Sequence, residues 1–113
     1  MEKTVLVIGG AYQDKTKAAL EYLKLPKDEL SDGELLEDFA NFYRKWENGD
    51  DALLDFLKNK ITVCDEMGCG IVPLDKNDRD FRENLGRFLC RLAERADIVL
   101  RVQCGIAAAI KGE

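Results

Sequence analysis

The hydrophobic positions of the chain follow two periodicities, and the first is a set of short continuous runs. Residues 4–8, 61–64 and 97–102 are mainly apolar and rich in β-branched side chains. Runs of this kind are typical of strands that are buried on both faces of a parallel sheet. Leu35 and Leu36 offer a further, very short strand. We therefore expect a sheet whose last strand is formed by residues 97–102.

The second periodicity places apolar side chains three or four residues apart, which is the spacing of one face of an α-helix. Residues 15–23 form a short segment of this kind that ends before Pro26, and residues 77–95 form a long one. Residues 25–33 are a polar connector that contains Pro, Ser, Asp and Gly. This composition predicts a loop between the first helix and the short strand.

A stripe of aromatic residues occupies the middle of the chain. Phe39, Phe42, Tyr43 and Trp46 lie on one helical face, and residues 48–50 break the pattern before a second helical stretch. Such a stripe fits either a helix that faces the core or a surface on which bases stack. Burial is the ordinary function of aromatic stripes on helices, so we favour the core-facing helix.

Strands that alternate with helices predict an α/β fold in three layers, in which helices cover both faces of a mostly parallel sheet. The 113 residues allow one hydrophobic core, so we expect a single domain over residues 1–113. In sheets of this class, binding sites lie at the carboxyl ends of the strands. The loops that follow residues 8 and 64 are therefore the expected positions of functional residues.

The composition disfavours several classes of protein. Apolar residues make up 46% of the chain and charged residues 35%, which is not the composition of a disordered protein. The 17 Lys and Arg residues against 22 Asp and Glu residues give a net charge of −5, which disfavours nucleic acids and anionic membranes as partners. No apolar run approaches the ~20 residues of a membrane-spanning helix, and the first residues do not resemble a secretion signal. We expect a cytoplasmic protein.

The chain has four cysteines and no histidine. Cys64, Cys69, Cys90 and Cys104 show no paired C-x-x-C spacing, which favours free thiols over a zinc site or disulfides. Histidine is the commonest metal ligand and the commonest general base at neutral pH. Any chemistry in this chain must therefore use carboxylates, lysine, or a bound nucleotide with its metal.

A motif for phosphate binding follows the first predicted strand. Residues 9–16 read G-G-A-Y-Q-D-K-T and fit the loop G-x-x-x-x-G-K-[ST] at every fixed position except the second glycine, which is aspartate. In that motif, backbone N–H groups and a helix N-terminus bind phosphate oxygens, the lysine neutralises the β- and γ-phosphates, and the hydroxyl binds Mg²⁺. The predicted nucleotide-binding residues are Gly9, Gly10, Ala11, Asp14, Lys15 and Thr16.

Asp14 leaves a second interpretation open. Its carboxylate brings a like charge next to a bound phosphate, at a cost of about 1–4 kcal/mol when partly screened. Because aspartate is a favoured N-cap, the segment also fits a plain strand-to-helix turn in which Asp14 caps the helix.

A second candidate site is the glycine-rich loop at residues 65–73, D-E-M-G-C-G-I-V-P, which follows the strand at residues 61–64. An acid at the end of a strand binds Mg²⁺ directly or through water, or positions an attacking hydroxyl, in many nucleotide enzymes. Glu66 is the main candidate for this function and Asp65 a weaker one. The alternative is that both acids cap and solvate the loop.

This second loop resembles the adenosylcobinamide kinase / adenosylcobinamide-phosphate guanylyltransferase family, which reads T-N-E-V-G-M-G-I-V-P at this place. The resemblance continues without a gap to Lys111, and Gly9, Gly10 and Ala11 match the family's G-G-A-R-S-G-K-S loop. The resemblance implies a P-loop fold of the RecA type, here in a reduced form. Family members phosphorylate the aminopropanol hydroxyl of adenosylcobinamide, then transfer GMP from GTP through a guanylylated histidine.

The chain departs from this family in length and in one residue type. It is shorter than a full member, lacks the central segment that bears the guanylylated histidine, and has no histidine to replace it. The resemblance therefore implies a cobinamide kinase-like protein without the guanylyltransferase step, with Lys15 and Glu66 as catalytic residues. It implies Mg²⁺ with ATP or GTP as the cofactor, held by Thr16 and Glu66.

The resemblance also bears on partners. A nucleotide and a corrinoid are the expected ligands, and a homo-oligomer is expected because the family forms trimers. The alternative is a non-catalytic paralogue that binds a nucleotide or a corrinoid, or acts as a partner subunit. Asp14 favours this alternative, because it weakens the case for a bound triphosphate.

Overall fold

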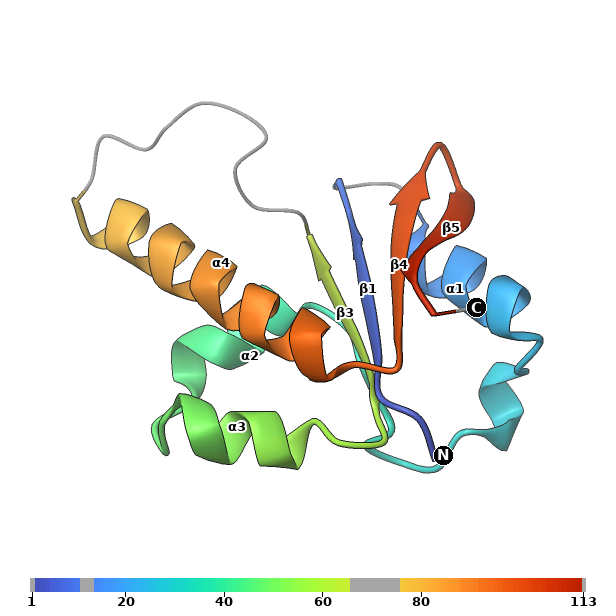
Figure 1. Cartoon of the computed structure of the whole chain (residues 1–113), viewed down its shortest axis with the longest axis horizontal. Coiled ribbons are helices and arrows are strands. Elements are labelled where there is room, and N and C mark those ends of the chain that lie inside the picture. Colours follow the sequence, from blue (N-terminus) through green and yellow to red (C-terminus); the bar gives the residue numbers. More distant parts are fainter. Residues whose placement is uncertain (1, 11–13, 66–75, 113) are drawn as a thin grey trace.

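A five-stranded sheet forms the centre of the computed structural model, which describes residues 2–10, 14–65 and 76–112 (Figure 1). The strands are β1 (Val5–Gly9), β2 (Leu35–Leu36), β3 (Ile61–Asp65), β4 (Ile98–Gln103) and β5 (Ile106–Lys111). Their order in the sheet is β2-β3-β1-β4-β5, and the first four run parallel. The expected α/β class, with a mostly parallel sheet, is therefore confirmed.

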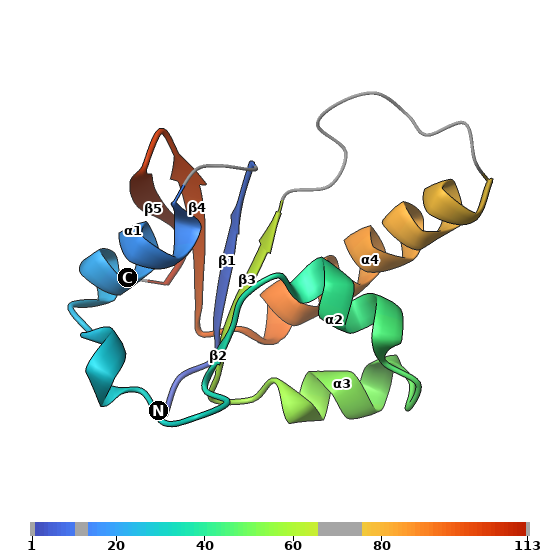
Figure 2. The same ribbon diagram turned by 180° about the vertical axis from the view of Figure 1, so that it is seen from behind.

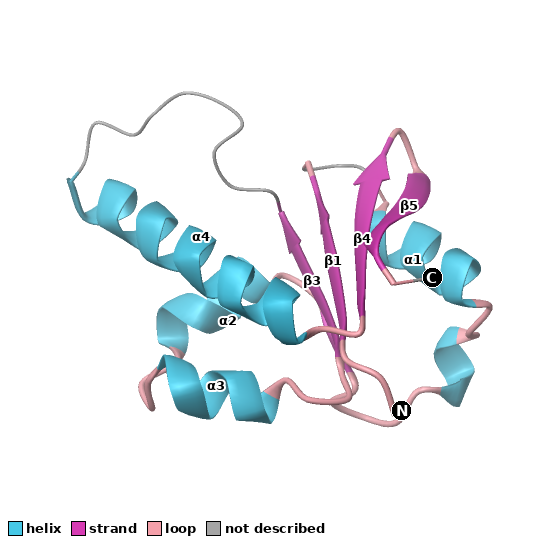
Figure 3. Ribbon diagram, in the orientation of Figure 1, coloured by secondary structure: helices cyan, strands magenta, loops and turns pink. Residues whose placement is uncertain are grey.

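Helices cover both faces of the sheet (Figures 2 and 3). They are α1 (Lys15–Leu23), α2 (Phe39–Lys45), α3 (Asp50–Phe56) and α4 (Lys76–Arg95), and the 3₁₀ turn η1 lies at Lys27–Glu29. Helix α1 lies on one face, and α2, α3 and α4 lie on the other. No helix in the described part of the chain is long and apolar enough to cross a bilayer.

Each face of the sheet has its own hydrophobic core. On the α1 side, the strand residues Val5, Val7 and Leu100 pack against Ala18 and Ala19 of the helix. On the other side, Leu6 and its neighbours pack against the three remaining helices. This division follows from the alternation of side chains along a strand, because a strand between two helical layers must be apolar on both faces.

The aromatic stripe belongs to the second core, as expected. Phe39 is fully buried, and its ring stacks on that of Phe88 from α4 with 5.6 Å between the centroids. Tyr43 packs against the same ring at 5.2 Å. Phe42 and Trp46 pack against Phe56 of α3. The stripe therefore joins α2 to its neighbouring helices and provides no surface for stacked bases.

The last strand of the sheet differs from the prediction. Residues 97–102 are not the final strand, because β5 follows β4 after a two-residue turn and pairs with it in the antiparallel direction. Cys104 and Gly105 form this turn with φ angles of 53° and 74°. Two consecutive positive φ angles are the signature of the tight hairpin turn that matches strand twist. The turn therefore reverses the chain and adds an antiparallel edge to the parallel sheet.

The register of the central strands determines where the site lies. Gly9 at the end of β1 pairs with Asp65 at the end of β3 and with Val102 of β4. A Cβ atom on Gly9 would lie 2.6 Å from the carbonyl oxygen of Val102, so this position requires glycine. The loops that leave β1 and β3 therefore start side by side at the same edge of the sheet.

Candidate functional site

Lys15 is the first residue of α1, and its ammonium group points to the ends of two neighbouring strands. Its Nζ atom donates to the carbonyl oxygen of Gly10 at 2.9 Å and to Oδ1 of Asp65 at 2.5 Å. The Lys15 side chain is only 11% exposed, whereas that of Asp65 is 54% exposed. The candidate lysine of the phosphate motif is thus mostly buried, and its carboxylate partner is open to solvent.

Asp14 occupies the N-cap position of α1 but does not cap the helix with its side chain. Its φ and ψ angles are 49° and 47°, in the left-handed region, and its carbonyl oxygen accepts the backbone N–H of Ala18 at 3.0 Å. The left-handed region favours glycine and tolerates aspartate. The structure thus supplies a reason for glycine at this place in the phosphate motif, and the capping interpretation fails for the carboxylate.

Glu37 is a member of the site that the sequence interpretation missed. It follows β2 directly, and its Oε2 atom accepts the hydroxyl of Thr16 at 2.9 Å. Its Oε1 atom lies 3.7 Å from Nζ of Lys27. The available signal was weak, because it consisted of an acid after two leucines that form the shortest strand of the sheet. The rule that acids at strand ends carry function, applied to β2 as to β3, identifies it.

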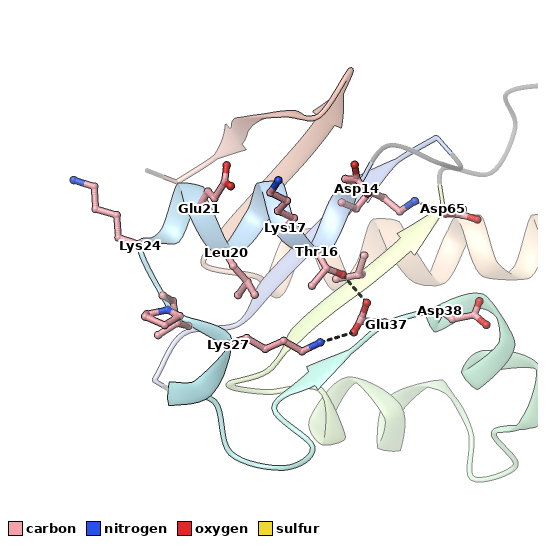
Figure 4. A pocket seen from close by; sticks show the side chains of 14 residues that line it. Asp14, Thr16, Lys17, Leu20, Glu21, Lys24, Lys27, Glu37, Asp38 and Asp65 are labelled. Atoms are coloured by element: carbon pink, nitrogen blue, oxygen red, sulfur yellow. Dashed lines mark hydrogen bonds and ion pairs between the residues drawn. The ribbon is translucent and has the colours of Figure 1, made fainter.

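These residues line one open pocket of about 1160 Å³ (Figure 4). Most of the residues that line it are charged or polar, among them Thr16, Glu37 and Asp65, and a minority are apolar, such as Leu20 and Leu25. The dashed lines of Figure 4 show Glu37 between Thr16 and Lys27. The charged lining suits a polar ligand, and the volume exceeds that of a typical small-molecule site.

The structure brings most of the predicted residues together. Gly9 ends β1 and Gly10 follows it, while Asp14 precedes α1, Lys15 and Thr16 begin it, and all three line the pocket. Ala11 and Glu66 lie outside the described residues, so their assigned functions stay predictions. Asp65, the weaker acidic candidate, is the described acid that contacts Lys15.

Cys64 is next to the site but does not fit the function of a nucleophile. Its side chain is buried, and burial, followed by the charge of Asp65, raises the pKa of its thiol to about 12. The thiolate is the reactive form of cysteine, so this thiol is inert near neutral pH. Cys64 and Cys90 are free thiols, and Cys69 lies outside the described residues.

The oxygen donors of the site suit Mg²⁺ that arrives with a nucleotide. Mg²⁺ prefers oxygen ligands and usually binds through one or two carboxylates together with substrate phosphates. The Thr16 hydroxyl and the Glu37 carboxylate already meet at hydrogen-bond distance. Within residues 2–10, 14–65 and 76–112, no three His, Cys, Asp or Glu side chains come close enough to hold a metal by themselves. The donor set therefore fits a nucleotide-bound ion.

Comparison with known proteins agrees with this fold. Residues 29–110 match the family described as cobinamide kinase / cobinamide phosphate guanyltransferase, whose members are P-loop nucleotide-binding proteins of cobalamin biosynthesis. The match starts after the phosphate motif at residues 9–16, so the evidence for that motif is its sequence and the geometry described above and not the family match. A search of curated proteins finds no significant match. Because the family match covers most of its length, the chain belongs to the cobinamide kinase / cobinamide phosphate guanyltransferase family.

Proposed function

We propose that this chain is a cobinamide kinase-like phosphotransferase, which transfers the γ-phosphate of ATP or GTP to the hydroxyl of a corrinoid alcohol. One observation carries the proposal: Lys15 and Thr16, side by side in the first turn of α1, meet acids at the ends of two neighbouring strands. Lysine, hydroxyl and carboxylates around one pocket are the groups that phosphoryl transfer requires, because its catalysis is mainly positioning and charge stabilisation.

The Lys15 ammonium is the group that would contact the β- and γ-phosphates. It is held by the Gly10 carbonyl on one side and by Asp65 on the other. A phosphate that binds here replaces Asp65 as the anionic partner, which costs little because the Asp65 side chain is half exposed. The backbone N–H groups at the start of α1 add a favourable field for the same anion.

Thr16 and Glu37 are the residues that would hold Mg²⁺, and Glu66 is a further candidate from outside the described residues. The ion would neutralise phosphate charge during the transfer. Without the ion, Glu37 accepts the Thr16 hydroxyl and lies 3.7 Å from Lys27, so its carboxylate is already oriented toward α1. The chain contains no histidine, so the proposal does not include transfer of GMP through a guanylylated histidine.

A second function, binding without catalysis, is favoured by two features of the same site. Asp14 stands at the position where the phosphate motif has glycine. In addition, the Lys15 ammonium already donates a hydrogen bond to the Asp65 carboxylate. Both acids compete with a triphosphate for positive charge. In this alternative the chain binds a nucleotide or a corrinoid weakly, or acts as a partner subunit.

Transfer of labelled γ-phosphate from ATP or GTP to cobinamide tests the kinase proposal. We expect transfer that is lost in Lys15→Ala and retained in Lys45→Ala, which replaces an exposed lysine of α2 outside the pocket. Transfer no greater in the native chain than in Lys15→Ala would remove the kinase function.

Calorimetry separates the alternative function from the first. Titration with Mg-GTP and with cobinamide measures binding independently of turnover. Binding of either ligand without transfer supports the non-catalytic protein, and loss of that binding in Lys15→Ala locates it at this site. Absence of binding for both ligands leaves only the function of a partner subunit.

A further inference from the structure

We propose that Lys27 is a second phosphate-binding residue of the pocket, one that contacts the terminal phosphate of a nucleoside triphosphate. The proposal rests on the proposed function, because it takes the nucleotide site at the start of α1 as given. It adds a residue that lies outside the phosphate motif at residues 9–16 and before the family match at residues 29–110. Its consequence is selectivity for triphosphates over diphosphates, which is measured without turnover.

The end of α1 determines where Lys27 lies. Lys24 takes a left-handed conformation with a φ angle of 54°, and the backbone N–H of Leu25 donates to the carbonyl oxygen of Leu20 at 3.0 Å. These contacts close the last turn of the helix, and Pro26 cannot continue it. The chain therefore turns, and η1 begins at Lys27, whose side chain extends back to the end of β2 (Figure 4).

Lys27 and Thr16 approach the two oxygens of one carboxylate. The Oε2 atom of Glu37 accepts the Thr16 hydroxyl at 2.9 Å, and its Oε1 atom lies 3.7 Å from Nζ of Lys27. Figure 4 shows Glu37 between the two residues, with Thr16 on α1 and Lys27 on η1. The Lys27 ammonium is therefore one carboxylate away from the helix end at which the phosphates are proposed to bind.

The ion pair between Lys27 and Glu37 is loose. Its 3.7 Å separation is longer than a hydrogen bond, and the two side chains are 68% and 52% exposed. An exposed pair of this kind contributes little to stability, so the ammonium changes its partner at small cost. Lys15 differs, because its side chain is mostly buried and donates to both Gly10 and Asp65. One lysine is therefore held in place, and the other is free to follow a ligand.

The charges of the pocket favour a second cation at the phosphates. The described residues that line it include five acids and four lysines, namely Asp14, Glu21, Glu37, Asp38 and Asp65 against Lys15, Lys17, Lys24 and Lys27. A polyphosphate adds negative charge to this set, and Lys15 offsets only part of it. In Figure 4, Lys27 extends toward Glu37, whereas Lys17 and Lys24 extend away from it. Lys27 is therefore the lysine that is placed to supply the further charge.

The position of Lys27 selects the terminal phosphate. In the phosphate motif, backbone N–H groups hold the α- and β-phosphates, and the lysine, here Lys15, reaches the β- and γ-phosphates. Lys27 approaches from η1, next to Glu37, which is proposed to hold Mg²⁺. Because Mg²⁺ bridges β- and γ-phosphate oxygens, the terminal phosphate replaces Glu37 as the partner of the Lys27 ammonium. A diphosphate lacks this group and gains little from Lys27.

Calorimetry on the full chain tests the proposal with Mg-GTP and Mg-ATP and with the corresponding diphosphates. Lys27→Gln removes the charge and keeps a side chain of similar reach, and Lys27→Arg keeps the charge. Lys24→Gln is the matched control, because Lys24 is an exposed lysine of the same pocket that extends away from Glu37. Thermal unfolding followed by circular dichroism verifies the fold of each variant.

We expect Lys27→Gln to weaken binding of the triphosphate ~10-fold, because a charged hydrogen bond to the terminal phosphate is lost. The same variant should change binding of the diphosphate by less than about twofold. Lys27→Arg should keep the preference for the triphosphate, and Lys24→Gln should bind both nucleotides as the native chain does.

Equal weakening of triphosphate and diphosphate binding in Lys27→Gln would overturn the proposal, and so would a loss of the preference in Lys27→Arg. Unchanged or tighter triphosphate binding in Lys27→Gln, together with lost binding in Lys15→Ala, would refute the function of Lys27 and leave the phosphate site intact. A native chain that binds no triphosphate would refute both. Binding without phosphate transfer contradicts the kinase function alone, and the preference lost in Lys27→Gln then still supports the proposal.

Discussion

The two ends of the parallel sheet use polar residues in opposite ways. At the amino end, the backbone N–H of Thr4 donates to Oδ2 of Asp97 at 2.8 Å, and the Thr4 hydroxyl accepts the N–H of Asn59 at 2.9 Å. At the carboxyl end, Lys15 meets Asp65 and Thr16 meets Glu37, so side chains bond to side chains. A bond to the backbone fixes the chain, whereas a bond to an exposed carboxylate, such as that of Asp65 or Glu37, can be exchanged for a bond to a ligand.

The largest expected effect comes from removing the misplaced charge at the carboxyl end. Asp14→Gly removes a carboxylate next to the proposed phosphate site and suits the φ angle of 49°. We expect tighter binding of Mg-GTP, by up to about a thousandfold if the charge costs the full ~4 kcal/mol. Calorimetry measures the affinity.

The matched control for this variant lies at the amino end. Asn59 has a φ angle of 59°, so Asn59→Gly makes the same change of backbone preference without touching the pocket. We expect no change in nucleotide affinity for this variant. Equal affinities of Asp14→Gly and the native chain would mean that the turn does not bind phosphate.

A second effect appears in alkaline solution. Cys64 is buried, and its thiol pKa is raised from the usual 9 to about 12. The folded state therefore holds the thiol proton more tightly than the unfolded state does. The resulting contribution to the free energy of unfolding is complete below pH 9 and is lost as the pH rises toward 12. In this range the free energy of unfolding should fall with a slope that approaches ~1.4 kcal/mol per pH unit. Denaturant unfolding at several pH values measures it.

Cys64→Ala removes this titration and should flatten the slope above pH 9. Tyr43 contributes in the same direction, because burial and the charge of Asp50 raise the pKa of its hydroxyl. Tyr43→Phe therefore separates the tyrosine contribution from that of the thiol. An unchanged slope in Cys64→Ala would contradict the burial of the thiol.

The sequence predicted the central strands, the helices and the short edge strand β2 better than the other edge of the sheet, β5. The runs at β1 and β3 are β-branched and buried on both faces, so their apolar pattern is determined by the core itself. β5 has three consecutive alanines, which carry no strand preference, and becomes a strand only because the turn at Cys104 and Gly105 places it beside β4. Tertiary pairing of this kind leaves little trace in local sequence.

The residues of the candidate site also divide into those that local sequence predicts and those that depend on the pairing of strands. Lys15 and Thr16 were predicted because a fixed spacing of residue types follows a strong strand. Glu37 was missed because its contact with Thr16 depends on the position of β2 beside β3, which a two-residue strand does not reveal. The contact between Lys15 and Asp65 likewise depends on the register that pairs Gly9 with Asp65.

Two threonines provide a direct comparison of the two ends. Thr4 is buried and its hydroxyl accepts a backbone N–H, so Thr4→Val should lower the free energy of unfolding by about 1–2 kcal/mol and leave nucleotide affinity unchanged. Thr16 bonds to the exposed Glu37, so Thr16→Val should change the unfolding free energy by less than about 0.5 kcal/mol and reduce phosphate transfer. A loss of stability in Thr16→Val, or a loss of nucleotide affinity in Thr4→Val, would contradict the division into a structural amino end and a functional carboxyl end.

The smallest expected effect concerns Asp65, and it distinguishes competition from catalysis. Asp65→Asn keeps the size of the side chain and removes its charge, so the Lys15 ammonium loses an anionic partner. Because the Asp65 side chain is half exposed, the unfolding free energy should fall by less than about 1 kcal/mol. If Asp65 only competes with phosphate, calorimetry will show affinity for Mg-GTP raised severalfold and phosphate transfer unimpaired. If Asp65 also serves the transfer, affinity will rise while the transfer rate falls, and a fall in affinity would show that this carboxylate helps to hold the nucleotide.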